Sequence, residues 1–265
     1  MKNLIITYKN WESLPSQFKA NIEKIAVLND AWHLHFFGNQ EIEIFIKKNY
    51  TTDIFEAFKS IHRSYGAAQA DFFRYLVLYR MGGIYIDAKT KVEQPFDTWI
   101  SRDDQYIVSQ WSRAHLEKYP NSGRHRAIDH ISGGEFINWF LFSKPNHPFL
   151  KRTISCVLHR IQNYSPFFTG LGKGATLKTT GPIAYTLAVH PILRKHSHRF
   201  INNLENYGVS YSIMEGSNHE SIFQNHYSNS TEPLSKIHPI HWLAYRAFRH
   251  TKRVAKKILR VAPHL

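Results

Sequence analysis

The sequence predicts an α/β fold, and three observations lead to that prediction. Short apolar segments with the length of buried strands alternate with segments whose apolar residues recur every three to four positions, as in helices. One long apolar helix pattern stops at a Gly-Gly pair, and a strand pattern follows at once. Hydrophobic residues make up 43% and aromatic residues 14% of the 265 residues, enough for a sizeable core. Such alternation is typical of a parallel sheet covered by helices.

Strand patterns and helix patterns follow one another along the chain. Short apolar runs bounded by turn residues predict strands at residues 3–8, 32–37, 84–87, 105–111, 135–142 and 209–215. Apolar residues with a helical period predict helices at residues 14–29, 40–50, 53–61, 67–81, 147–164 and 181–193. In the first helix the apolar face consists of Phe18, Ile22 and Ile25, with Leu28 beside them.

A polar segment at residues 112–134, rich in histidine, arginine and glycine, interrupts this alternation. A connection of this length favours a functional or mobile loop. Its histidines are His115, His125 and His130. They are candidates for binding a metal or an acidic acceptor, with a solvated loop as the default interpretation. In the second strand, His33 and His35 have no third ligand at a recognisable spacing, so we expect ordinary sheet histidines there.

The charge balance points to a polyanionic partner. Lys and Arg total 34 against 20 Asp and Glu, a formal net charge of +14, which suits a nucleic acid, an anionic lipid or a phosphate-bearing substrate. The single cysteine, Cys156, excludes a disulfide within the chain and a cysteine-based zinc cluster. No signal peptide is recognisable, and no apolar run approaches the roughly 20 residues of a membrane span. We therefore expect a cytoplasmic protein.

The helix expected at residues 67–81 is apolar nearly all round, which predicts that it is buried. It nevertheless carries Asp71 and Arg74, which share a face because they are three residues apart. Burying them unpaired would cost several kcal/mol, so mutual neutralisation is the simplest expectation. The strand after the Gly-Gly turn ends with Asp87 and Lys89, two residues that a strand would point the same way. Packing of helix and strand would bring these four charged groups together where open α/β sheets bind ligands.

The block AAQADFFRYLVLYRMGGIYIDAK, residues 67–89, resembles the signature of glycosyltransferase family 32. This family contains bacterial capsular and lipopolysaccharide sugar transferases and relatives of the yeast Och1-type mannosyltransferases, and the glucosylating clostridial toxins have a similar spacing. The shared pattern is Ala-x-x-x-Asp-x-x-Arg, then Leu-Tyr, then Gly-Gly-x-Tyr-x-Asp-x-Asp. Weaker similarity continues through the segments IITYK, EFINWFLFSKPNHPFL, TTGPIAYT and HPIHW, and so covers most of the chain.

The resemblance implies a GT-A fold, in which helices flank a Rossmann-like mixed sheet, and a nucleotide-sugar donor. It favours UDP as the nucleotide, with GDP as the alternative. It also implies retention of the anomeric configuration. By position, Asp71 and Arg74 would hold the donor sugar, and Asp87 would contact ribose or sugar hydroxyls. Asn138 would lie near the transfer site. The further positions that the resemblance marks as donor-binding are Tyr8, Ala67, Gly83, Tyr85, His241 and Trp242.

Lys89 departs from the family pattern, which has a metal-binding aspartate at this position. A protonated lysine has no lone pair for a metal, but it can place a cation against a phosphate. Sugar transfer leaves a diphosphate whose developing charge must be stabilised. We hypothesise that Lys89, helped by Arg74, does this without a metal, and that Mn²⁺ or Mg²⁺ is needed only if it does not. The alternative is a solvated Lys89 in an inactive protein.

The expected activity is transfer of a hexosyl or N-acetylhexosaminyl group from a nucleotide sugar to a glycan or lipid-linked acceptor. The expected setting is the synthesis of a bacterial surface polysaccharide, either capsule or lipopolysaccharide. A rival hypothesis is a catalytically degenerate GT-A protein that serves as a basic module for binding nucleic acid or membrane. The net charge favours the rival, but the intact spacing of Asp71, Arg74 and Asp87 does not. No sequence signature of specific nucleic-acid recognition is present.

The chain divides into an expected transferase domain, residues 1–240, and a basic amphipathic tail, residues 241–265. One helical face of the tail carries Ala244, Phe248, Ala255, Ile258, Leu259 and Ala262. The other carries Arg246, Arg249, Arg253, Lys256, Lys257 and Arg260, with Lys252 nearby. This pattern predicts an interfacial helix, residues 242–262, on the anionic inner face of the cell membrane. A helix packed on the protein's own core is the alternative.

Overall fold

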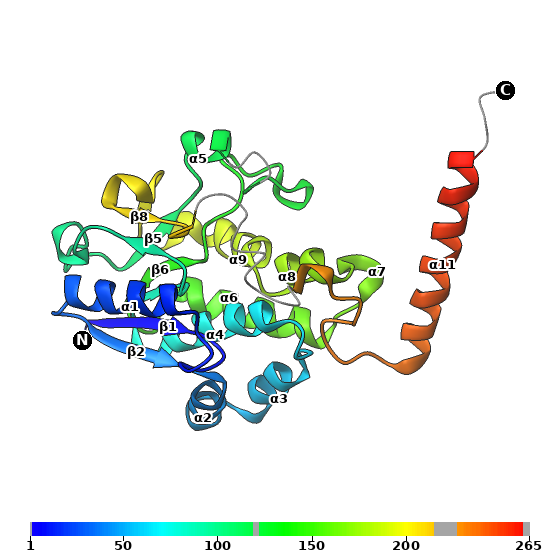
Figure 1. The fold of residues 1–265 in the computed structure, drawn as a ribbon, viewed down its shortest axis with the longest axis horizontal. Helices are drawn as coiled ribbons and strands as arrows, with labels where there is room; N and C mark the ends of the chain where they lie inside the picture. Colours follow the sequence, from blue (N-terminus) through cyan, green and yellow to red (C-terminus); the bar gives the residue numbers. More distant parts are fainter. Residues whose placement is uncertain (1, 119–121, 215–226, 262–265) are drawn as a thin grey trace.

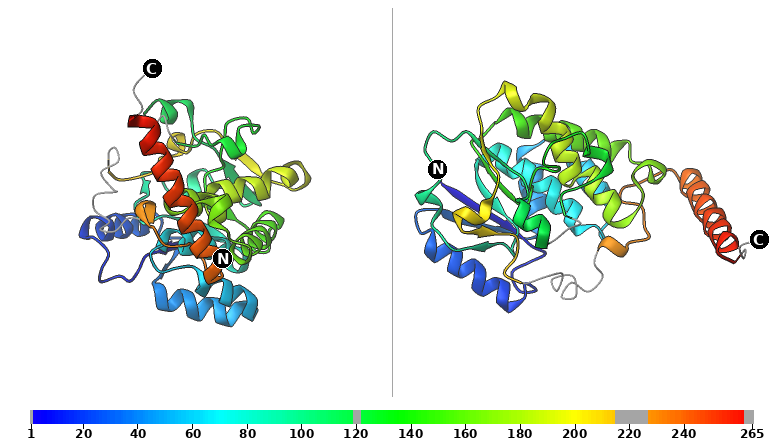
Figure 2. Two further views of the ribbon diagram at one scale, coloured as in Figure 1. Left: turned by 90° about the vertical axis from the view of Figure 1, so that its right-hand side faces the viewer. Right: turned by 90° about the horizontal axis from the view of Figure 1, so that it is seen from above.

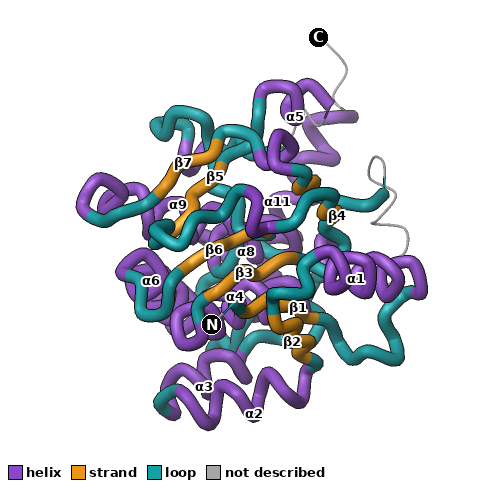
Figure 3. The backbone as a smooth tube through the Cα atoms, turned by 90° about the vertical axis from the view of Figure 1, so that its left-hand side faces the viewer, coloured by secondary structure: helices purple, strands orange, loops and turns teal. Residues whose placement is uncertain are grey.

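The computed structural model describes residues 2–118, 122–214 and 227–261. A six-stranded sheet lies between two layers of helices (Figures 1 and 3), and its strand order is β2-β1-β3-β6-β5-β7. Its strands are β1 (Asn3–Thr7), β2 (His33–Phe37), β3 (Gly83–Ile86), β5 (Tyr106–Ser109), β6 (Phe140–Ser143) and β7 (Arg199–Ile201). A small second sheet pairs β4 (Lys91–Val92) with β8 (Val209–Ser210).

The sheet is mixed, which corrects the all-parallel sheet that the alternation of patterns predicts and agrees with the sheet that the GT-A resemblance implies. Strands β2, β1 and β3 are parallel, and β7 is parallel to β5. Strand β6 runs antiparallel to both of its neighbours, β3 and β5. Parallel neighbours need a crossover, and helices supply it on the way from β1 to β2 and from β2 to β3. The segment between β5 and β6 contains only short helices, and it returns the chain in the opposite direction.

Helices occupy the segments where the helical period predicts them, and further helices form elsewhere. They are α1 (Ser16–Leu28), α2 (Asn39–Asn49), α3 (Thr52–Ser60), α4 (Gly66–Met81), α5 (Arg113–Lys118), α6 (Pro148–Gln162), α7 (Pro166–Thr169), α8 (Gly172–Thr179), α9 (Pro182–Val189) and α11 (Pro239–Val261). Of these, α5, α7 and α8 are the further helices that the helical period does not predict. The predicted face of α1 is confirmed, because Phe18, Ile22 and Ile25 are buried and Leu28 is half-buried against the same core.

Side chains alternate across the sheet, so each face has its own core. Leu4 and Ile6 of β1 pack with α1 on one face, whereas Ile5 packs with α4 and α6 on the other. Helix α4 is buried along most of its length, as its apolar composition predicts. The sheet and α4 thus form a rigid frame, and every charged side chain placed on that frame has a fixed position.

The Gly82-Gly83 turn between α4 and β3 is also confirmed. Both residues have positive φ angles, 64° and 108°, which favour glycine. A Cβ atom on Gly83 would lie 2.2 Å from the carbonyl oxygen of Asn3, so no larger residue fits. The turn brings the end of α4 directly to the start of β3, beside β1.

Several predicted strands are shorter than expected, and three of these differences concern the site or its surroundings. Strand β3 ends at Ile86, β6 begins only at Phe140, and the strand expected at 209–215 is limited to β8. Residue 215 lies outside the described residues. Asp87 and Lys89 therefore belong to a turn, closed by a hydrogen bond from the Thr90 amide to the Asp87 carbonyl (2.8 Å). The two-residue alternation of a strand does not apply to them.

The polar segment at 112–134 is partly ordered by α5 and by a short 3₁₀ helix, Arg126–Ile128. At the end of the chain, α11 stands apart from the sheet and its helices (Figures 1 and 2). Among the described residues, no helix combines the length and the apolar character that crossing a membrane requires.

Candidate active site

The candidate site lies at the edge of the sheet where β1 and β3 end. These strands are parallel, with Leu4 opposite Ile84 and Ile5 opposite Tyr85. Their carboxyl ends therefore meet at one edge, with Thr7 near Asp87. Strand β6 runs the other way, so the residues before it return to the same edge, and the Asp87 amide donates to the Trp139 carbonyl (3.0 Å). Ligands bind at this edge in open α/β sheets.

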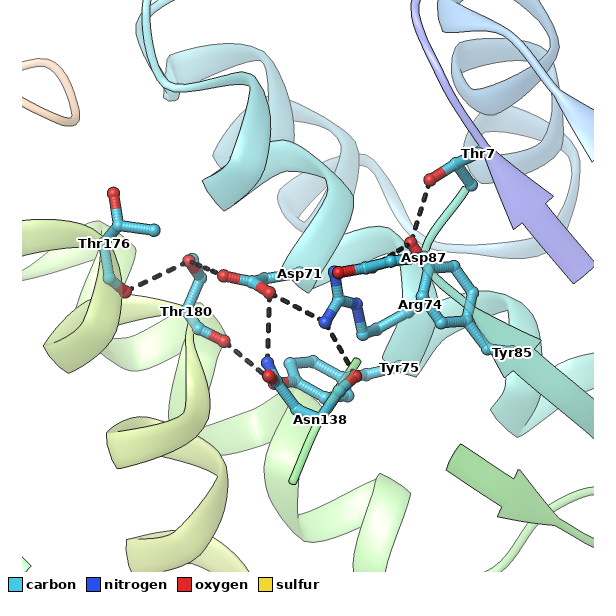
Figure 4. Close-up of polar contacts among 9 residues, drawn as sticks. All are labelled: Thr7, Asp71, Arg74, Tyr75, Tyr85, Asp87, Asn138, Thr176 and Thr180. Carbon is cyan, nitrogen blue, oxygen red and sulfur yellow. Dashed lines mark hydrogen bonds and ion pairs between the residues drawn. The ribbon is translucent and has the colours of Figure 1, made fainter. Parts of the chain in front are cut away.

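Arg74 of α4 is the centre of the site (Figure 4). Its Nη1 atom lies 3.1 Å from Asp71 Oδ1 and donates a 2.7 Å hydrogen bond to the carbonyl oxygen of Asn138. Its Nη2 atom donates to Asp87 Oδ1 at 3.0 Å. The guanidinium also stacks 4.7 Å from the centre of the Tyr85 ring. One cation thus connects α4, the end of β3 and the segment before β6.

The three charged side chains differ in how much surface they offer to a ligand. Arg74 is 5% exposed and Asp71 9%, whereas Asp87 is 26% exposed. A buried charge is tolerated only when it is paired and hydrogen-bonded. Asp71 and Arg74, the two buried members of this cluster, are paired with each other and hydrogen-bonded. Asp87 is therefore the member that can contact a substrate most directly.

Asp71 accepts three interactions inside this cluster. Besides the contact with Arg74, its carboxylate accepts hydrogen bonds from Asn138 Nδ2 (3.0 Å) and from Thr180 Oγ1 (3.3 Å). Burial raises the pKa of Asp71 from its usual 3.8 to about 6, and nearby Asp87 adds to this rise. The positive charge of Arg74 and the two hydrogen bonds work in the opposite direction. The carboxylate is therefore ionised at neutral pH.

Burial alone would lower the pKa of Arg74, but nearby Tyr85, Asp87 and Asp71 outweigh this effect and raise it. Arg74 is therefore a permanent cation. Its charge is opposed by two carboxylates, so the cluster as a whole is an anion with one buried cation. A ligand that approaches from the Asp87 side meets this partly exposed carboxylate first.

Asn138 is held as firmly as Asp71. Its Nδ2 atom also donates to the hydroxyl oxygen of Tyr75 (3.0 Å), which in turn donates to the Thr180 carbonyl (3.0 Å). Burial raises the pKa of Tyr75 well above its usual 10, so this hydroxyl keeps its proton. Asn138 was expected within a strand, but it precedes β6. It reaches the cluster because β6 is antiparallel to β3.

Tyr85 contacts the carboxylate of Asp87 through its hydroxyl group. Its hydroxyl donates a long hydrogen bond to Asp87 Oδ1 (3.4 Å) and shares another with Thr7 Oγ1 (2.9 Å). The ring is buried. Tyr85 therefore orients the carboxylate, and it offers little surface of its own to a donor, in contrast to the donor-binding position that the resemblance implies.

Lys89 follows Asp87 by two residues in the turn after β3. Its ammonium group lies 3.7 Å from the centre of the Tyr211 ring. That ring contacts Trp111 and Trp139, with both pairs of ring centres 5.4 Å apart. Of the four charged groups expected to meet, Asp71 and Asp87 each contact Arg74 directly. Lys89 sits on an aromatic support beside them because the strand that would have aligned it ends at Ile86.

The remaining predicted donor positions divide into two groups. Tyr8 follows β1 at the edge that holds Asp87, and Ala67 lies one helical turn before Asp71 on the same face of α4. Their contact with a donor stays a prediction. Gly83 starts β3, roughly 13 Å of strand away from Asp87, and packs on Asn3. The role of Gly83 is to form the turn between α4 and β3.

His241 and Trp242 belong to α11, away from the cluster (Figure 1). Their ring contacts are with neighbours of the same segment, His238 and Tyr245. Because they belong to the amphipathic helix that begins at Pro239, they lie away from the sheet edge that holds the cluster. In this structure they do not close over the site, as the resemblance implied they would.

The histidines singled out in the sequence have ordinary partners. His35 contacts Asn3 Oδ1 (2.9 Å) in the sheet, and its ring lies 4.4 Å from that of His33. In the polar segment, His125 pairs with Glu135 (2.7 Å) and the His115 ring stacks on an indole. Within the described ranges, no three or more histidine, cysteine, aspartate or glutamate side chains are grouped as a metal ion would require.

The residues at the position of the family's metal site fit a divalent cation poorly. Asp87 supplies one carboxylate, and that carboxylate already accepts hydrogen bonds from Arg74 and Tyr85. The second position supplies an ammonium group, Lys89, which has no lone pair while protonated. This donor set suits an anionic ligand beside a cation better than it suits Mn²⁺ or Mg²⁺.

Sequence reasoning did not single out Thr7, Tyr75 or Thr180. Tyr75 is adjacent to Arg74, but in the sequence it is one of several aromatic residues in an apolar helix and does not stand out from them. Thr180 lies in the TTGPIAYT segment, which shows weak family similarity, and this was the one available signal. Its hydrogen bond to Asp71 joins residues 109 apart in sequence, and no local pattern encodes such a contact.

Comparison with known proteins gives these positions a context. Residues 15–107 match the family model described as "Glycosyltransferase sugar-binding region containing DXD motif". The initiation-specific alpha-1,6-mannosyltransferase of Candida albicans is 26% identical over 162 residues, 58% of this chain and 41% of that protein. Mannosyl phosphorylinositol ceramide synthase CSH1 of Saccharomyces cerevisiae is 26% identical over 204 residues, 77% of this chain and 44% of that protein.

The solved structure of the PaToxG glycosyltransferase shares the fold, with a TM-score of 0.52 at 15% identity over 73% of this chain and 70% of that one. The GT-A fold and the resemblance to the DXD-type transferases of family 32 are thereby confirmed. The chain spans less than half the length of the curated relatives described here. The matched region includes Asp71, Arg74 and Asp87 and excludes Asn138.

Proposed function

We propose that this chain, a glycosyltransferase of the family 32 type, transfers a sugar from a nucleotide-sugar donor to a hydroxyl group of a glycan or lipid-linked acceptor. One observation carries the proposal. Two of the family's charged residues, Asp71 and Asp87, both contact the third, Arg74, at the carboxyl edge of the sheet. A degenerate protein would have no reason to keep two carboxylates paired with a largely buried guanidinium between an apolar helix and the turn after β3.

Asp87 takes the direct role, because its carboxylate is the most exposed part of the cluster. It accepts hydrogen bonds from hydroxyl groups of the donor's sugar or ribose. Asp71 and Arg74 were expected to hold the donor sugar themselves. Their burial and their contacts within the cluster favour a positioning role, in which Arg74 fixes Asp87 and Asp71 fixes Asn138. A site whose groups are held before the substrate arrives stabilises the transition state without reorganising.

Lys89 stabilises the leaving diphosphate in this proposal. The sugar becomes oxocarbenium-like as its bond to the diphosphate breaks, and negative charge grows on the leaving oxygen. A lysine ammonium is a compact cation suited to that charge. The rings of Tyr211, Trp111 and Trp139 support the turn that carries it. Catalysis without a divalent metal follows from this assignment.

Retention of configuration requires no separate protein base, because the leaving phosphate can take the proton of the acceptor hydroxyl. This fits a cluster whose carboxylates are already engaged. Asp71 is buried against Arg74, Asn138 and Thr180, and Asp87 is paired with the same arginine. We therefore assign a retaining reaction.

The names of two yeast relatives specify mannosyl transfer, which makes a mannosyl group the first hexosyl candidate here. An N-acetylhexosaminyl donor and the preference for UDP stay predictions, and GDP-sugars belong in the same screen. The relatives reported above are yeast proteins and give no support to a bacterial capsule or lipopolysaccharide acceptor. That setting, the cytoplasmic location and the domain boundary at residue 240 also stay predictions.

Donor binding tests the proposal. The purified chain is screened by thermal unfolding against UDP- and GDP-sugars, GDP-mannose included, with EDTA and separately with Mn²⁺. A donor at about 100 times its Kd raises Tm by roughly 5 °C, since binding adds about 2.7 kcal/mol of stability. The expected result is a rise that EDTA does not remove and that Asp87→Ala abolishes. If no nucleotide sugar shifts Tm, or if Asp87→Ala responds like the unaltered protein, the proposed site is wrong.

A further inference from the structure

Helix α11 turns its apolar face away from the protein. Between Pro239 and Lys252, the side chain that is buried is Tyr245, whose ring packs 5.1 Å from Phe167 of α7. At about 100° per residue, Ile240, Leu243 and Ala247 lie roughly 140–160° around the helix from Tyr245. All three are exposed, Ile240 by 68% and Leu243 by 67%. The alternative of a tail packed by its apolar face on the core is therefore not what this structure shows.

Exposed apolar side chains gather in this region. Eight large hydrophobic residues are exposed in the described part of the chain, and five of them belong to α7 or α11. We call these five the α7–α11 patch; it consists of Phe167, Phe168, Ile240, Leu243 and Phe248. Phe168 is 83% exposed. Phe167 and Phe248 contact each other near Tyr245, with ring centres 5.7 Å apart, whereas Ile240 and Leu243 lie on the other side of the helix. A gathering of exposed large apolar residues in one region marks an interaction surface rather than chance exposure.

The charge of the helix indicates what covers the patch. Residues 239–265 contain seven Lys and Arg and no Asp or Glu. Arg246, Arg249 and Lys252 are exposed. At about 100° per residue, Arg246 lies roughly 60° around the helix from Leu243, whereas Arg249 and Lys252 lie within roughly 40° of Tyr245. A second copy of the chain would bring two such cationic helices together with no acidic partner on either. An anionic surface with an apolar interior complements both faces.

We propose that α11 and α7 dock this protein on a lipid bilayer that contains anionic headgroups. Leu243 and its apolar neighbours enter the boundary between headgroups and acyl chains. Arg246, at the flank of that face, meets the lipid phosphates, and Arg249 and Lys252 contribute through longer-range attraction to the anionic surface.

The protein body contacts α11 at Tyr245 and Phe248, whose rings pack on Phe167, and Tyr245 lies roughly 140–160° around the helix from Ile240 and Leu243. The body therefore does not obstruct the approach of Ile240 and Leu243 to a flat surface.

The geometry suits a helix that lies on the bilayer. Helix α11 has 23 residues, about 35 Å at 1.5 Å per residue, and basic residues recur along its sequence. Each basic residue near an anionic surface strengthens partitioning roughly fivefold, and each apolar side chain that enters the interface strengthens it by about tenfold. This docking does not depend on the proposed transfer reaction, so either can fail without the other.

Vesicle co-sedimentation of the full chain tests the docking. Vesicles of phosphatidylcholine with 30–40% phosphatidylglycerol, roughly the anionic fraction at which polybasic segments bind well, are compared with pure phosphatidylcholine at moderate salt. We expect binding to the anionic vesicles and weak binding to the neutral ones. Leu243→Asp should reduce partitioning about tenfold or more. The triple variant Arg246→Gln, Arg249→Gln, Lys252→Gln should reduce it roughly a hundredfold.

The matched control is Val27→Asp, which places the same charge on an apolar residue of α1 that is 81% exposed. It should bind vesicles like the unaltered protein, and thermal unfolding shows that both aspartate variants are folded. Equal losses for Leu243→Asp and Val27→Asp would overturn the proposal, as would the absence of binding to anionic vesicles.

Two other results would also overturn the docking. Sedimentation velocity that shows a dimer converted to a monomer by Leu243→Asp would make a second copy the occupant of the patch. Salt-sensitive binding to DNA that the triple variant loses, without vesicle binding, would make nucleic acid the partner. Transfer to a soluble acceptor serves as a separate readout, and Leu243→Asp should leave it unchanged.

Discussion

The cluster around Arg74 and the helix α11 use charge in opposite ways. In the cluster, one buried guanidinium meets two carboxylates, and an amide and a hydroxyl group donate hydrogen bonds to Asp71. In α11, the described cations are exposed, and the helix has no acidic residue. Buried charges must find partners within the chain, because water cannot solvate them. Exposed charges have no such requirement.

This difference indicates where each region finds its ligand. In the cluster, Asp71 and Arg74 are buried and only Asp87 is partly exposed, so a substrate adds contacts to groups that are already fixed. In α11, apolar and basic side chains are both exposed along the helix, so its partner must be a large surface. Half of the net positive charge of the chain, seven of +14, lies in residues 239–265, and this part says little about the reaction.

Asp87→Ala should cause the largest effect. It removes the exposed carboxylate at a chain position where no core packing is lost, so transfer should fall at least a thousandfold, about 4 kcal/mol of transition-state stabilisation, while the fold is retained. Release of nucleoside diphosphate from the donor measures the activity, and urea unfolding measures the stability. Asp30→Ala, at an exposed aspartate after α1, is the matched control. Full turnover by Asp87→Ala would show that the site lies elsewhere.

Arg74→Met should be the most destabilising change in the cluster. It leaves Asp71 and Asp87 facing one another without a cation, which costs about 3–5 kcal/mol in the free energy of unfolding. Asp71→Asn in the same background should restore part of that loss, because it removes one of the two uncompensated charges. Urea unfolding of the four members of this double-mutant cycle gives the coupling energy.

The control for this cycle is Arg80→Met, on the same helix but exposed, which should cost under about 1 kcal/mol. Similar losses for Arg74→Met and Arg80→Met would mean that the buried ion pairs contribute no more than a surface cation.

Lys89→Ala should reduce the rate by about 2–4 kcal/mol, the amount that one preorganised group gives to a developing charge. The loss should appear in kcat, because the charge develops only in the transition state. Activity of the unaltered protein should persist in EDTA. A strict requirement for Mn²⁺ together with an unchanged rate in Lys89→Ala would contradict the assignment and direct the search to metal ligands around Asp87.

The pH profile should show the smallest of these effects. The pKa of Asp71 is raised to about 6, so this carboxyl becomes protonated as pH falls below 6, and its hold on Asn138 and Arg74 weakens. Activity should fall by up to about tenfold per pH unit between pH 6 and 5. The folded state binds this proton more tightly than the unfolded state, so the contribution of Asp71 to stability increases as pH falls from about 6 towards 4.

Asp71→Asn separates this group from the others that titrate. It should lack the acidic limb near pH 6 in kcat/KM, and it should lack the stability increment between pH 6 and 4. An unchanged limb in Asp71→Asn would assign the titration to another group.

Much of the frame follows from local patterns. The period of apolar residues predicts α1, α4 and α6, and Gly82-Gly83 predicts the turn that delivers Asp87 to the sheet edge. The Asp71–Arg74 pair is predictable because unpaired charges in an apolar helix are costly. The resemblance carried by residues 67–89 adds the fold and the reaction class.

The contacts that complete the site come from distant parts of the chain, and local patterns do not encode them. Asn138 reaches Asp71 because β6 is antiparallel, and Thr180 arrives from the segment before α9. The sequence does not predict where the Lys89 ammonium group lies, because its position depends on the residue at which β3 ends. In α11 the amphipathic pattern is evident in the sequence, but only Tyr245 reveals which face turns towards the body.

The most direct test of the central claim is sugar transfer by the purified chain in the presence of EDTA. The assay would use GDP-mannose and a panel of UDP-sugars as donors and a soluble glycan as acceptor. It would measure nucleoside diphosphate release and product mass for the unaltered protein and for Asp87→Ala. The account predicts at least one donor whose sugar is transferred by the unaltered protein and not by Asp87→Ala, with the anomeric configuration retained in the product. Transfer that is equal in the two proteins, or that appears for no donor with or without Mn²⁺, would contradict it.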